Sequence, residues 1–431
     1  MVVTEVSPPQ NLPESRIENG QIWPRGAIAA TEHGTLIEHF GKYLGELIMD
    51  TGGPYGPIGV QYVINPLIRF VHIPGGVRDP LHESEHEVTP GLVYNYQGGV
   101  NPDGTYQYGR GLATITTYCA AYCSFCTRGD VVGKARGKYL VDDDRPRTLA
   151  TKNQLTFAEV DQIFEFYRTE PWIDEIIISG GDFMLAQQEL FEYVVNGLVR
   201  LQDETKYNPY LQKIVPALSI IRIGTRLPLQ NPNLVEDERI EMLKPLHNLN
   251  LMFHGNNSAE LTQKALSAID KFRDIRGVTL YSQSVLLRGV NALLKPGYEQ
   301  NIHEQELEYE VRQGPDGNKY RVPVTDHSID ETATVQTLMN MYHALKVNGI
   351  VPYYLFQNDA VQWAQLLTVP PPQAIRLTNR ILSRLSGLAN KAEFVFDNGN
   401  GKVHAKMLDP DAAGYTDWRG NFVPWGELIT E

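Results

Sequence analysis

The sequence predicts an α/β fold in which parallel strands, covered by helices, form a partial or complete barrel. Short apolar runs alternate with helical patterns along most of the chain after residue 105. The runs are continuous rather than alternating, as expected for strands buried on both faces. About six such units follow one another, which suits a barrel better than an open sheet. With hydrophobic residues making up 42% of 431 residues, the chain can bury a large core.

The first clear helix is expected after Thr156, which forms a capping-box pattern with Glu159. Apolar residues then recur at helical spacing, at positions 160, 163, 164 and 167. The apolar run over 175–179 before two glycines predicts a buried strand and a tight turn. A helix is expected around 186–201, and further strands near 218–224, 249–254, 278–286, 351–356 and 393–397.

Two stretches depart from this rhythm. Residues 1–105 are rich in Pro, Gly and Tyr and predict an N-terminal cap. Residues 295–328 are charged and contain a Gly-Pro-Asp-Gly turn, which predicts an inserted hairpin. The predicted division is a cap over 1–105, a barrel over 106–365 carrying this insertion, and a C-terminal region over 366–431.

Composition argues against several classes of partner. The formal net charge of −13 is a poor match for nucleic acid or an anionic membrane surface. No apolar run approaches the roughly 18 residues that a membrane helix needs. The first residues carry neither the basic nor the apolar region of a secretory signal. We therefore expect a cytoplasmic protein without nucleic-acid or membrane partners.

The only three cysteines, Cys119, Cys123 and Cys126, lie in a C-x3-C-x2-C cluster. Three cysteines are too few for a tetrahedral zinc site and an odd number for a disulfide framework. They could be small buried side chains, but their clustering favours an iron–sulfur site, since thiolates hold such clusters. Three thiolates leave one iron of a cubane without a protein ligand, where a small molecule can chelate.

Two further patterns surround the cysteines. Gly180, Gly181 and Asp182 follow a predicted strand, at the end where barrel active sites gather, although such a turn alone is commonplace. Arg128, two residues after the last cysteine, could bind a carboxylate through both arms of its guanidinium. Arg110, at the start of the preceding strand, could hold a phosphate.

Near the end, Asp397 and a Gly/Asn-rich turn precede Lys402. Such a turn is typical of a surface loop, but its glycines would also let the backbone approach a cofactor ring. A desolvated lysine amine there could attack an aldehyde and form a Schiff base. Asp359 ends another predicted strand and would lie at the same functional rim.

Together these motifs resemble the lysine 2,3-aminomutase family, radical S-adenosylmethionine (AdoMet) enzymes that also carry pyridoxal phosphate (PLP). The resemblance extends from about residue 79 to residue 402. It rests on Cys119-x3-Cys-x2-Cys126-Thr-Arg128, Ile177-Ile-Ser-Gly-Gly-Asp182, Ile221-Arg-Ile-Gly-Thr-Arg226, Gln283-Ser-Val-Leu-Leu-Arg-Gly-Val-Asn291, Pro352-Tyr-Tyr-Leu-Phe-Gln-Asn-Asp359 and Asp397-Asn-Gly-Asn-Gly-Lys402. It implies a radical AdoMet core, which is a partial (β/α)6-type TIM-like barrel, with a C-terminal extension that carries the PLP lysine.

The resemblance also implies a role for each matching residue. The three cysteines would ligate a [4Fe–4S] cluster. The residues expected along the methionine part of AdoMet are Gly180, Gly181, Asp182, Gln283 and His254. Lys402 would hold PLP and Arg110 its phosphate. Arg128 would bind the substrate carboxylate, and the two acids expected at the far ammonium of lysine are Asp359 and Asp397.

The chain departs from the family pattern in several places. Only four residues separate Asp397 from Lys402, fewer than in the family, so Asp397 could be displaced. Phe356 stands where the family has a tyrosine near PLP. The segments 94–106 and 295–328 are additional. The further cysteines that bind a structural zinc in some members are missing.

The expected activity is a 2,3-aminomutase that moves the α-amino group of an amino acid to the β-carbon, with two acids favouring a basic substrate such as lysine. A flavodoxin- or ferredoxin-like protein would donate the electron, and a homo-oligomer is compatible with the sequence. Two alternatives stay open. The same machinery could act on another amino acid or with another outcome, such as decarboxylation, or the chain could be an iron–sulfur protein without PLP.

Overall fold

The computed structural model describes residues 39–63, 77, 79–129, 131–132, 148–299, 304–361, 364–397, 401–417 and 420–430. It also gives the backbone of two short paired strands, β1 (Ile17–Glu18) and β2 (Gln21–Ile22). Much of the predicted cap over 1–105 lies outside the described residues. None of the described helices combines the length and the hydropathy needed to cross a bilayer.

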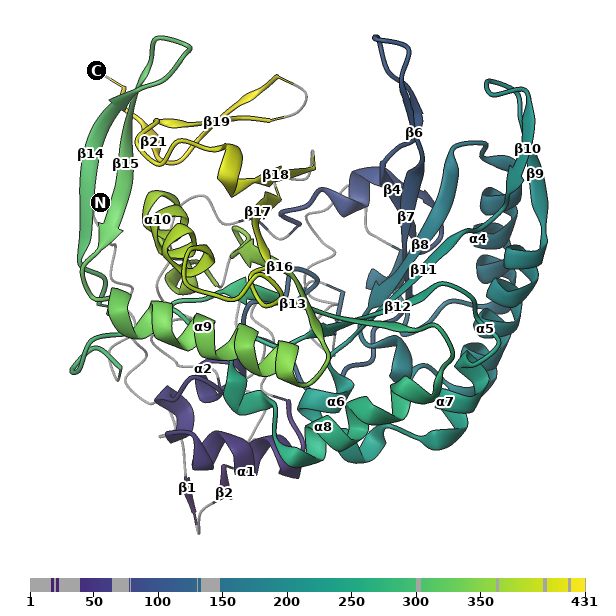
Figure 1. Cartoon of the computed structure of the whole chain (residues 1–431), viewed down its shortest axis with the longest axis horizontal. Coiled ribbons are helices and arrows are strands. Elements are labelled where there is room, and N and C mark those ends of the chain that lie inside the picture. Colours follow the sequence, from purple (N-terminus) through teal and green to yellow (C-terminus); the bar gives the residue numbers. More distant parts are fainter. Residues whose placement is uncertain are drawn as a thin grey trace.

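One ten-stranded sheet organises the chain (Figure 1). Its strands, from one edge to the other, are β18 (Lys402–His404), β17 (Glu393–Asp397), β16 (Val351–Gln357), β13 (Thr279–Leu286), β12 (Leu249–His254), β11 (Ile220–Thr225), β8 (Ile173–Gly180), β7 (Gly109–Thr116), β4 (Leu92–Tyr96) and β3 (Glu87–Thr89). Neighbouring strands from β7 to β17 are parallel. The outer strands β3, β4 and β18 pair antiparallel.

Helices lie around the outer side of this curved sheet (Figure 1). They are α4 (Phe157–Thr169), α5 (Gln188–Asp203), α6 (Leu227–Gln230), α7 (Asp237–Leu243), α8 (Gln263–Asp270), α9 (Glu331–Val347) and α10 (Pro371–Leu382). The predicted capping box is confirmed: the Thr156 hydroxyl accepts from the Glu159 amide, and the Glu159 carboxylate accepts from the Thr156 amide. The four apolar positions of α4 are all buried, as predicted.

The α/β class is confirmed, with a large and mostly parallel sheet. Among the described strands the ladder is open, with β3 and β18 at its two edges. The closed form of the expected barrel is therefore not seen, and the partial barrel stays a prediction. The sheet also takes strands from all three predicted regions, since β4 precedes residue 105 and β17 follows residue 366.

The predicted inserted hairpin is present as β14 (Leu307–Gln313) and β15 (Lys319–Asp326), to which β21 (Glu427–Leu428) adds a third strand. Arg288 and Asp326 anchor it through an ion pair of 2.7 Å between fully buried side chains. Three smaller hairpins are β5 (Gly99–Val100) with β6 (Tyr106–Gln107), β9 (Thr205–Asn208) with β10 (Lys213–Pro216), and β19 (Gly414–Thr416) with β20 (Phe422–Pro424).

Two N-terminal helices, α1 (Lys42–Asp50) and α2 (Gly59–Tyr62), pack beneath the loop that carries the cysteines. Their apolar side chains form a separate buried cluster that includes Leu44, Ile48 and Ala121. The Ser124 amide donates to the Gln61 carbonyl at 2.7 Å. The cysteine loop is thus held from below by residues far from it in sequence.

Candidate active site

Two pockets meet inside the curve of the sheet. One contains Lys402 and the other contains the three cysteines. The residues that line both are Thr127, Arg128, Ser179, Gly224, Met252, His254, Gln283, Val285 and Asp359. Because the two pockets share this wall, the cysteine loop and the lysine lie in adjoining pockets.

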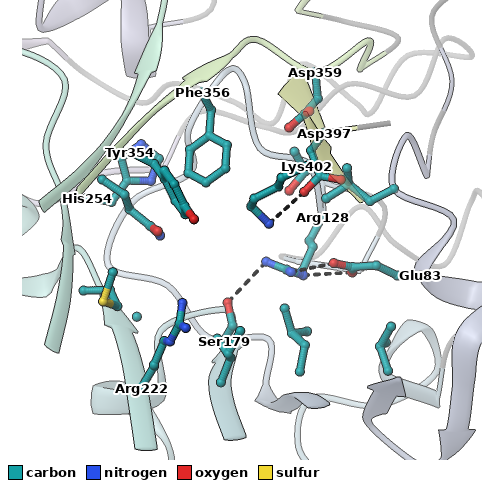
Figure 2. A pocket seen from close by; sticks show the side chains of 18 of the residues that line it. Glu83, Arg128, Ser179, Arg222, His254, Tyr354, Phe356, Asp359, Asp397 and Lys402 are labelled. Atoms are coloured by element: carbon teal, nitrogen blue, oxygen red, sulfur yellow. Dashed lines mark hydrogen bonds and ion pairs between the residues drawn. The ribbon is translucent and has the colours of Figure 1, made fainter. Parts of the chain in front are cut away.

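Lys402 is held by two partners in its pocket, Tyr96 and Asp397, and Figure 2 shows its contact with Asp397. Its Nζ lies 2.9 Å from Asp397 Oδ2 and donates to the Tyr96 hydroxyl at 2.9 Å. The Tyr96 hydroxyl donates in turn to Asp397 Oδ2 at 3.0 Å. Burial acts to lower the pKa of Lys402, but Asp397 and Tyr96 outweigh it, and the pKa is raised. The lysine is therefore an ammonium at neutral pH in the ligand-free chain.

Arg110 lies beside this group because β4 and β7 pair Tyr96 with Arg110. The centre of its guanidinium is 3.9 Å from the centroid of the Tyr96 ring, a cation–π contact. Arg110 and Lys402 line the same pocket, as a phosphate and a lysine anchor for one ligand would require. Phe356 also borders it, with its ring centroid 5.6 Å from Lys402 Nζ.

Arg128 lines both pockets and binds an acid of the chain itself (Figure 2). Its Nε and Nη2 donate to the two carboxylate oxygens of Glu83 at 2.9 and 2.5 Å, and Nη1 donates to Ser179 Oγ at 3.2 Å. This bidentate pair fixes the guanidinium plane. The structure thus places Arg128 in the cavity as expected, while the substrate contact stays a prediction.

The two predicted acids lie near each other but in different environments (Figure 2). Asp359 follows β16 and lies on the shared wall. Burial, together with the nearby charge of Asp397, raises the pKa of Asp359 to about 8. Asp397 instead binds Lys402 and Tyr96. The two acids therefore do not form an equivalent pair in the ligand-free chain.

All three cysteines line the second pocket. Burial raises the pKa of Cys119 well above its usual value, and the neighbouring Cys126 raises it further. Burial likewise raises the pKa of Cys123. A bound metal ion reverses this preference, because its charge deprotonates a coordinating thiol outright.

The described part of the chain contains no group of three or more His, Cys, Asp or Glu side chains arranged to hold a single metal ion. A [4Fe–4S] cluster makes a different demand, since each thiolate binds a different iron and the thiols need not converge on one point. Three thiols on one pocket wall fit that donor set.

The Gly180–Gly181 turn packs tightly against the start of the cysteine loop. A Cβ on Gly181 would lie 2.3 Å from the Tyr118 carbonyl oxygen, and Gly180 has a φ of +114°. The Gly181 amide donates to the Thr116 carbonyl at 2.7 Å. The glycines are thus required by close backbone packing, and both line the cysteine pocket.

The buried carboxylate of Asp182 organises the end of β11. It accepts from the Thr225 hydroxyl at 2.8 Å and from the backbone amides of Met184, Arg226 and Leu227 at 3.1, 2.9 and 3.1 Å. These bonds satisfy much of its hydrogen-bonding capacity. The structure therefore gives Asp182 a structural role beside the cysteine pocket, and the AdoMet contact expected for it stays a prediction.

His254 and Gln283 are register partners on β12 and β13, and both line both pockets. Burial lowers the pKa of His254 well below its usual value, and the positive charge of Arg226 adds to this. The imidazole is therefore neutral, with Nε2 3.2 Å from Asn256 Oδ1. Both residues lie on the wall that the two pockets share, and the AdoMet contact expected for them stays a prediction.

Three contacts in the site were missed by the sequence analysis: Tyr96 on Lys402, Glu83 on Arg128, and Arg226 on Cys123. Arg226 had a signal, because it lies in one of the motifs quoted above. Tyr96 and Glu83 had none, because neither belongs to a recognisable pattern.

No family model matches the chain. It is 31% identical over 359 residues to L-lysine 2,3-aminomutase of Bacillus subtilis. The aligned region covers 83% of this chain and 58% of that protein. It is 26% identical over 340 residues to L-lysine 2,3-aminomutase of Escherichia coli. Here the aligned region covers 79% of this chain and 74% of that protein. These similarities support the lysine 2,3-aminomutase family for this chain. It spans between 48% and 64% of the length of the first four relatives it matches.

At two of the positions where the sequence departs from the expected lysine 2,3-aminomutase pattern, the structure shows a specific contact with Lys402. The shortened loop makes Asp397 and Lys402 register partners in the β17–β18 hairpin. Phe356 stands where the resemblance leads us to expect a tyrosine, and the hydroxyl that binds Lys402 comes from Tyr96. Tyr96 lies at the end of β4, in the segment 94–106 that the sequence analysis expects to be additional.

Proposed function

We propose that this chain is a radical AdoMet and PLP-dependent 2,3-aminomutase that moves the α-amino group of a basic amino acid, such as lysine, to the β-carbon. The supporting observation is the shared wall between a pocket with three cysteines and a pocket with a buried lysine. This arrangement suits chemistry in which one ligand bound at the cysteines acts on another bound at the lysine.

In this proposal the three cysteines hold a [4Fe–4S] cluster, and Lys402, with Arg110, holds PLP. When bound, the cluster with AdoMet would supply hydrogen-atom abstraction, and PLP would supply a π-system through which the amino nitrogen migrates. The protein's own residues then bind, orient and keep water away from the reacting groups.

Lys402 must lose a proton before its nitrogen can act as a nucleophile. Asp397 Oδ2 and the Tyr96 hydroxyl oxygen, each 2.9 Å from Nζ, are the acceptors in contact with it. Tyr96 also donates to Asp397, so that the phenol links the amine and the carboxylate. We assign Asp397 as the proton acceptor and Tyr96 as the residue that positions it.

The carboxyl group of Asp359 supports the proposal that the substrate carries a positive charge. With a pKa of about 8, its carboxyl group is largely protonated at neutral pH in the ligand-free chain. An incoming ammonium group favours the ionised carboxylate, so binding would release a proton and form a partly buried ion pair. Arg128, fixed by Glu83, would hold the carboxylate end of the same substrate.

A second candidate is the same machinery acting on a non-basic amino acid. This candidate is supported by the contacts of Asp397 with Lys402 and Tyr96. Because of these contacts, Asp359 would bind the substrate side chain without a second carboxylate from Asp397. A substrate screen distinguishes the two candidates.

We also propose that the strands β7, β8, β11, β12, β13 and β16, which lie within the 106–365 region between the cap and the C-terminal region, are the partial (β/α)6-type barrel of a radical AdoMet core. A flavodoxin- or ferredoxin-like donor would reduce the cluster, and the chain would assemble as a homo-oligomer. Measuring the molecular size of the protein in solution tests the homo-oligomer. Mixing the cluster-loaded protein with each purified donor, and measuring whether the cluster is reduced, tests the electron donor.

The first test is reductive trapping. After incubation with PLP and treatment with borohydride, we expect a stable adduct on the peptide that contains Lys402. The adduct should disappear in Lys402→Arg and persist in Lys406→Arg, an exposed lysine four residues away. An adduct that is missing from the wild-type peptide would contradict the PLP part of the proposal.

The second test is an anaerobic screen of single amino acids with the reconstituted, reduced protein and AdoMet. We expect lysine or arginine to be converted to its β-amino isomer. If both are returned unchanged while alanine or glutamate reacts, the second candidate replaces the first. If none reacts in a protein that carries both cofactors, the aminomutase proposal is wrong.

A further inference from the structure

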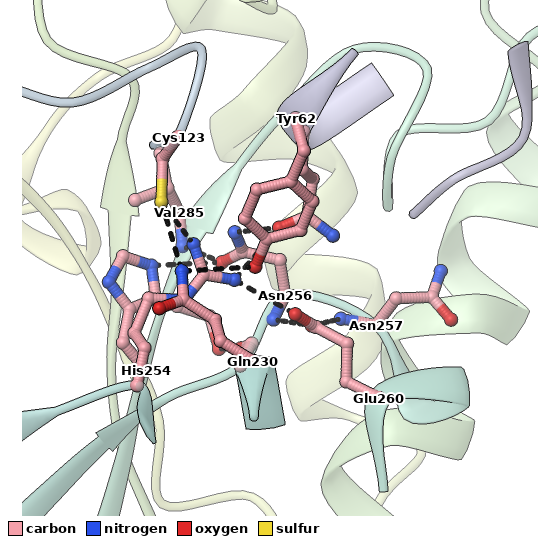
Figure 3. A network of polar contacts seen from close by, with 12 residues as sticks. Tyr62, Cys123, Gln230, His254, Asn256, Asn257, Glu260 and Val285 are labelled. Carbon is pink, nitrogen blue, oxygen red and sulfur yellow. Dashed lines mark hydrogen bonds and ion pairs between the residues drawn. The ribbon is translucent and has the colours of Figure 1, made fainter. Parts of the chain in front are cut away.

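The thiol of Cys123 accepts hydrogen bonds from two side chains at the end of β11 and in α6 (Figure 3). Arg226 Nη1 donates to Cys123 Sγ at 3.0 Å, and Gln230 Nε2 donates to the same sulfur at 3.6 Å. The Arg226 amide is fixed by Asp182 Oδ2 at 2.9 Å. A charged donor is thus placed on one of the three predicted cluster ligands.

The guanidinium of Arg226 is held by groups from two other segments. Arg226 Nη2 donates to Glu260 Oε1 at 2.8 Å and to Gln61 Oε1 at 3.0 Å. Glu260 Oε2 accepts from the amides of Asn256 and Asn257 at 2.5 and 2.9 Å. Both acceptors of Arg226 are therefore themselves buried and fixed.

The surroundings keep water away from this contact. The rings of Tyr62 and Phe125 lie 5.4 and 5.5 Å from the guanidinium carbon, at cation–π distance. Arg226 is 9% exposed, and its Nε is buried without a hydrogen-bond partner in the ligand-free chain. A buried donor without an acceptor is costly, and a cluster in this pocket would bring additional sulfur acceptors.

We propose that Arg226 sets the reduction potential of the iron–sulfur cluster by donating a hydrogen bond to the Cys123 thiolate, with Gln230 as a weaker second donor. This inference rests on the proposed function, because it requires that the cysteines hold a cluster. Reduction adds an electron, and the added negative charge is shared by the cluster sulfurs and thiolates. Hydrogen bonds to those sulfurs stabilise the reduced form more than the oxidised form and raise the potential.

A structural role for Arg226 is the competing explanation, since its ion pair with Glu260 also joins β11 to the loop after β12. The two roles differ in what they change. Loss of a structural ion pair lowers the stability of the fold, whereas loss of the sulfur contact changes the potential of a cluster that still assembles.

The test is a redox titration, followed by electron paramagnetic resonance, of the anaerobically reconstituted full chain without AdoMet. The main variant combines Arg226→Met with Glu260→Gln, so that donor and partner charges disappear together and the net charge of the site is unchanged. Gln230→Leu removes only the weaker donor and keeps the test open if the double variant does not fold. Arg222→Lys is the matched control, because Arg222 lies in the same motif but pairs with Glu175 and lines the other pocket.

We expect the double variant to reduce the equilibrium constant for one-electron reduction about tenfold, which corresponds to about 59 mV. Gln230→Leu should lower the potential by less, and Arg222→Lys should leave it unchanged. Equal potentials in the wild type and both variants, at equal iron content, would overturn the role of Arg226 and leave the proposed function standing. A wild-type chain that takes up no cluster would overturn both.

Discussion

Asp397 and Lys402 face each other across the β17–β18 hairpin, with Asp397 Oδ2 2.9 Å from Lys402 Nζ. Register partners in an antiparallel pair lie on the same face of a sheet. Because the loop between them is short, Asp397 contacts the lysine of its own chain, and the substrate contact expected for it stays a prediction. This relationship gives the site an internal ion pair that must open before Lys402 can react.

Asp397→Asn should lower the pKa of Lys402, because it removes the carboxylate that holds the ammonium form. An opposite charge at this distance is worth about 1–3 pH units. The midpoint of the pH dependence of PLP trapping at Lys402 should move down by that amount, since the neutral amine is the reacting form. Glu393→Gln, on the same strand but paired with His404 and Lys406, serves as the control. An unmoved midpoint would show that Asp397 does not hold the proton.

Tyr96→Phe should remove two hydrogen bonds, one to Lys402 and one to Asp397. A hydrogen bond to a charged group contributes about 1.5–3 kcal/mol, although Lys402 and Asp397 keep each other as partners. We therefore expect the free energy of unfolding in urea to fall by about 1–2 kcal/mol. Tyr207→Phe, which removes the hydroxyl of an exposed tyrosine, should cost much less. Equal stability of these two variants would contradict the role of Tyr96.

Arg128→Ala should destabilise the fold strongly, because it leaves the charge of Glu83 buried without its main partner. Breaking a buried pair in this way costs about 3–5 kcal/mol. Adding Glu83→Gln to the same chain should recover part of that loss by removing the unpaired charge. Urea unfolding of the single and double variants measures this, and a double variant less stable than Arg128→Ala would contradict it.

Asp359→Asn should change how stability depends on pH. The folded pKa of Asp359 is about 8, against an ordinary value of 3.8, so the folded chain binds one more proton than the unfolded chain between these limits. Stability from this group is therefore lost as pH rises toward 8 and levels off above it. Between pH 5.5 and 9, the wild-type Tm should fall relative to that of Asp359→Asn. Parallel curves would show that Asp359 is already ionised.

Local patterns predicted the parts of the fold that depend on local chemistry. The capping box at Thr156 and the apolar stripe of α4 follow from spacing alone, and both are confirmed. The strands of the parallel sheet were predicted from continuous apolar runs in the sequence. The pairing of β4, from the predicted cap, with β7 could not be predicted, because no local pattern encodes it.

The same distinction separates the site residues that could be predicted from those that could not. The cysteines and Lys402 were identified by motifs, and the structure places them in two adjoining pockets that share a wall. Tyr96 reaches Lys402 across 306 positions of sequence, and Arg128 reaches Glu83 across 45. Such contacts form only when the chain folds, so no spacing of residues along the sequence predicts them.

The hydrogen bond from Tyr96 to Asp397 has a consequence for biosynthesis. It joins β4 to β17 across 301 positions of sequence, and both residues line the Lys402 pocket. Every described residue that lines the cysteine pocket leaves the ribosome before Asp397 and Lys402 do. A nascent chain thus completes the cysteine half of the cavity first, while its lysine wall is still being synthesised.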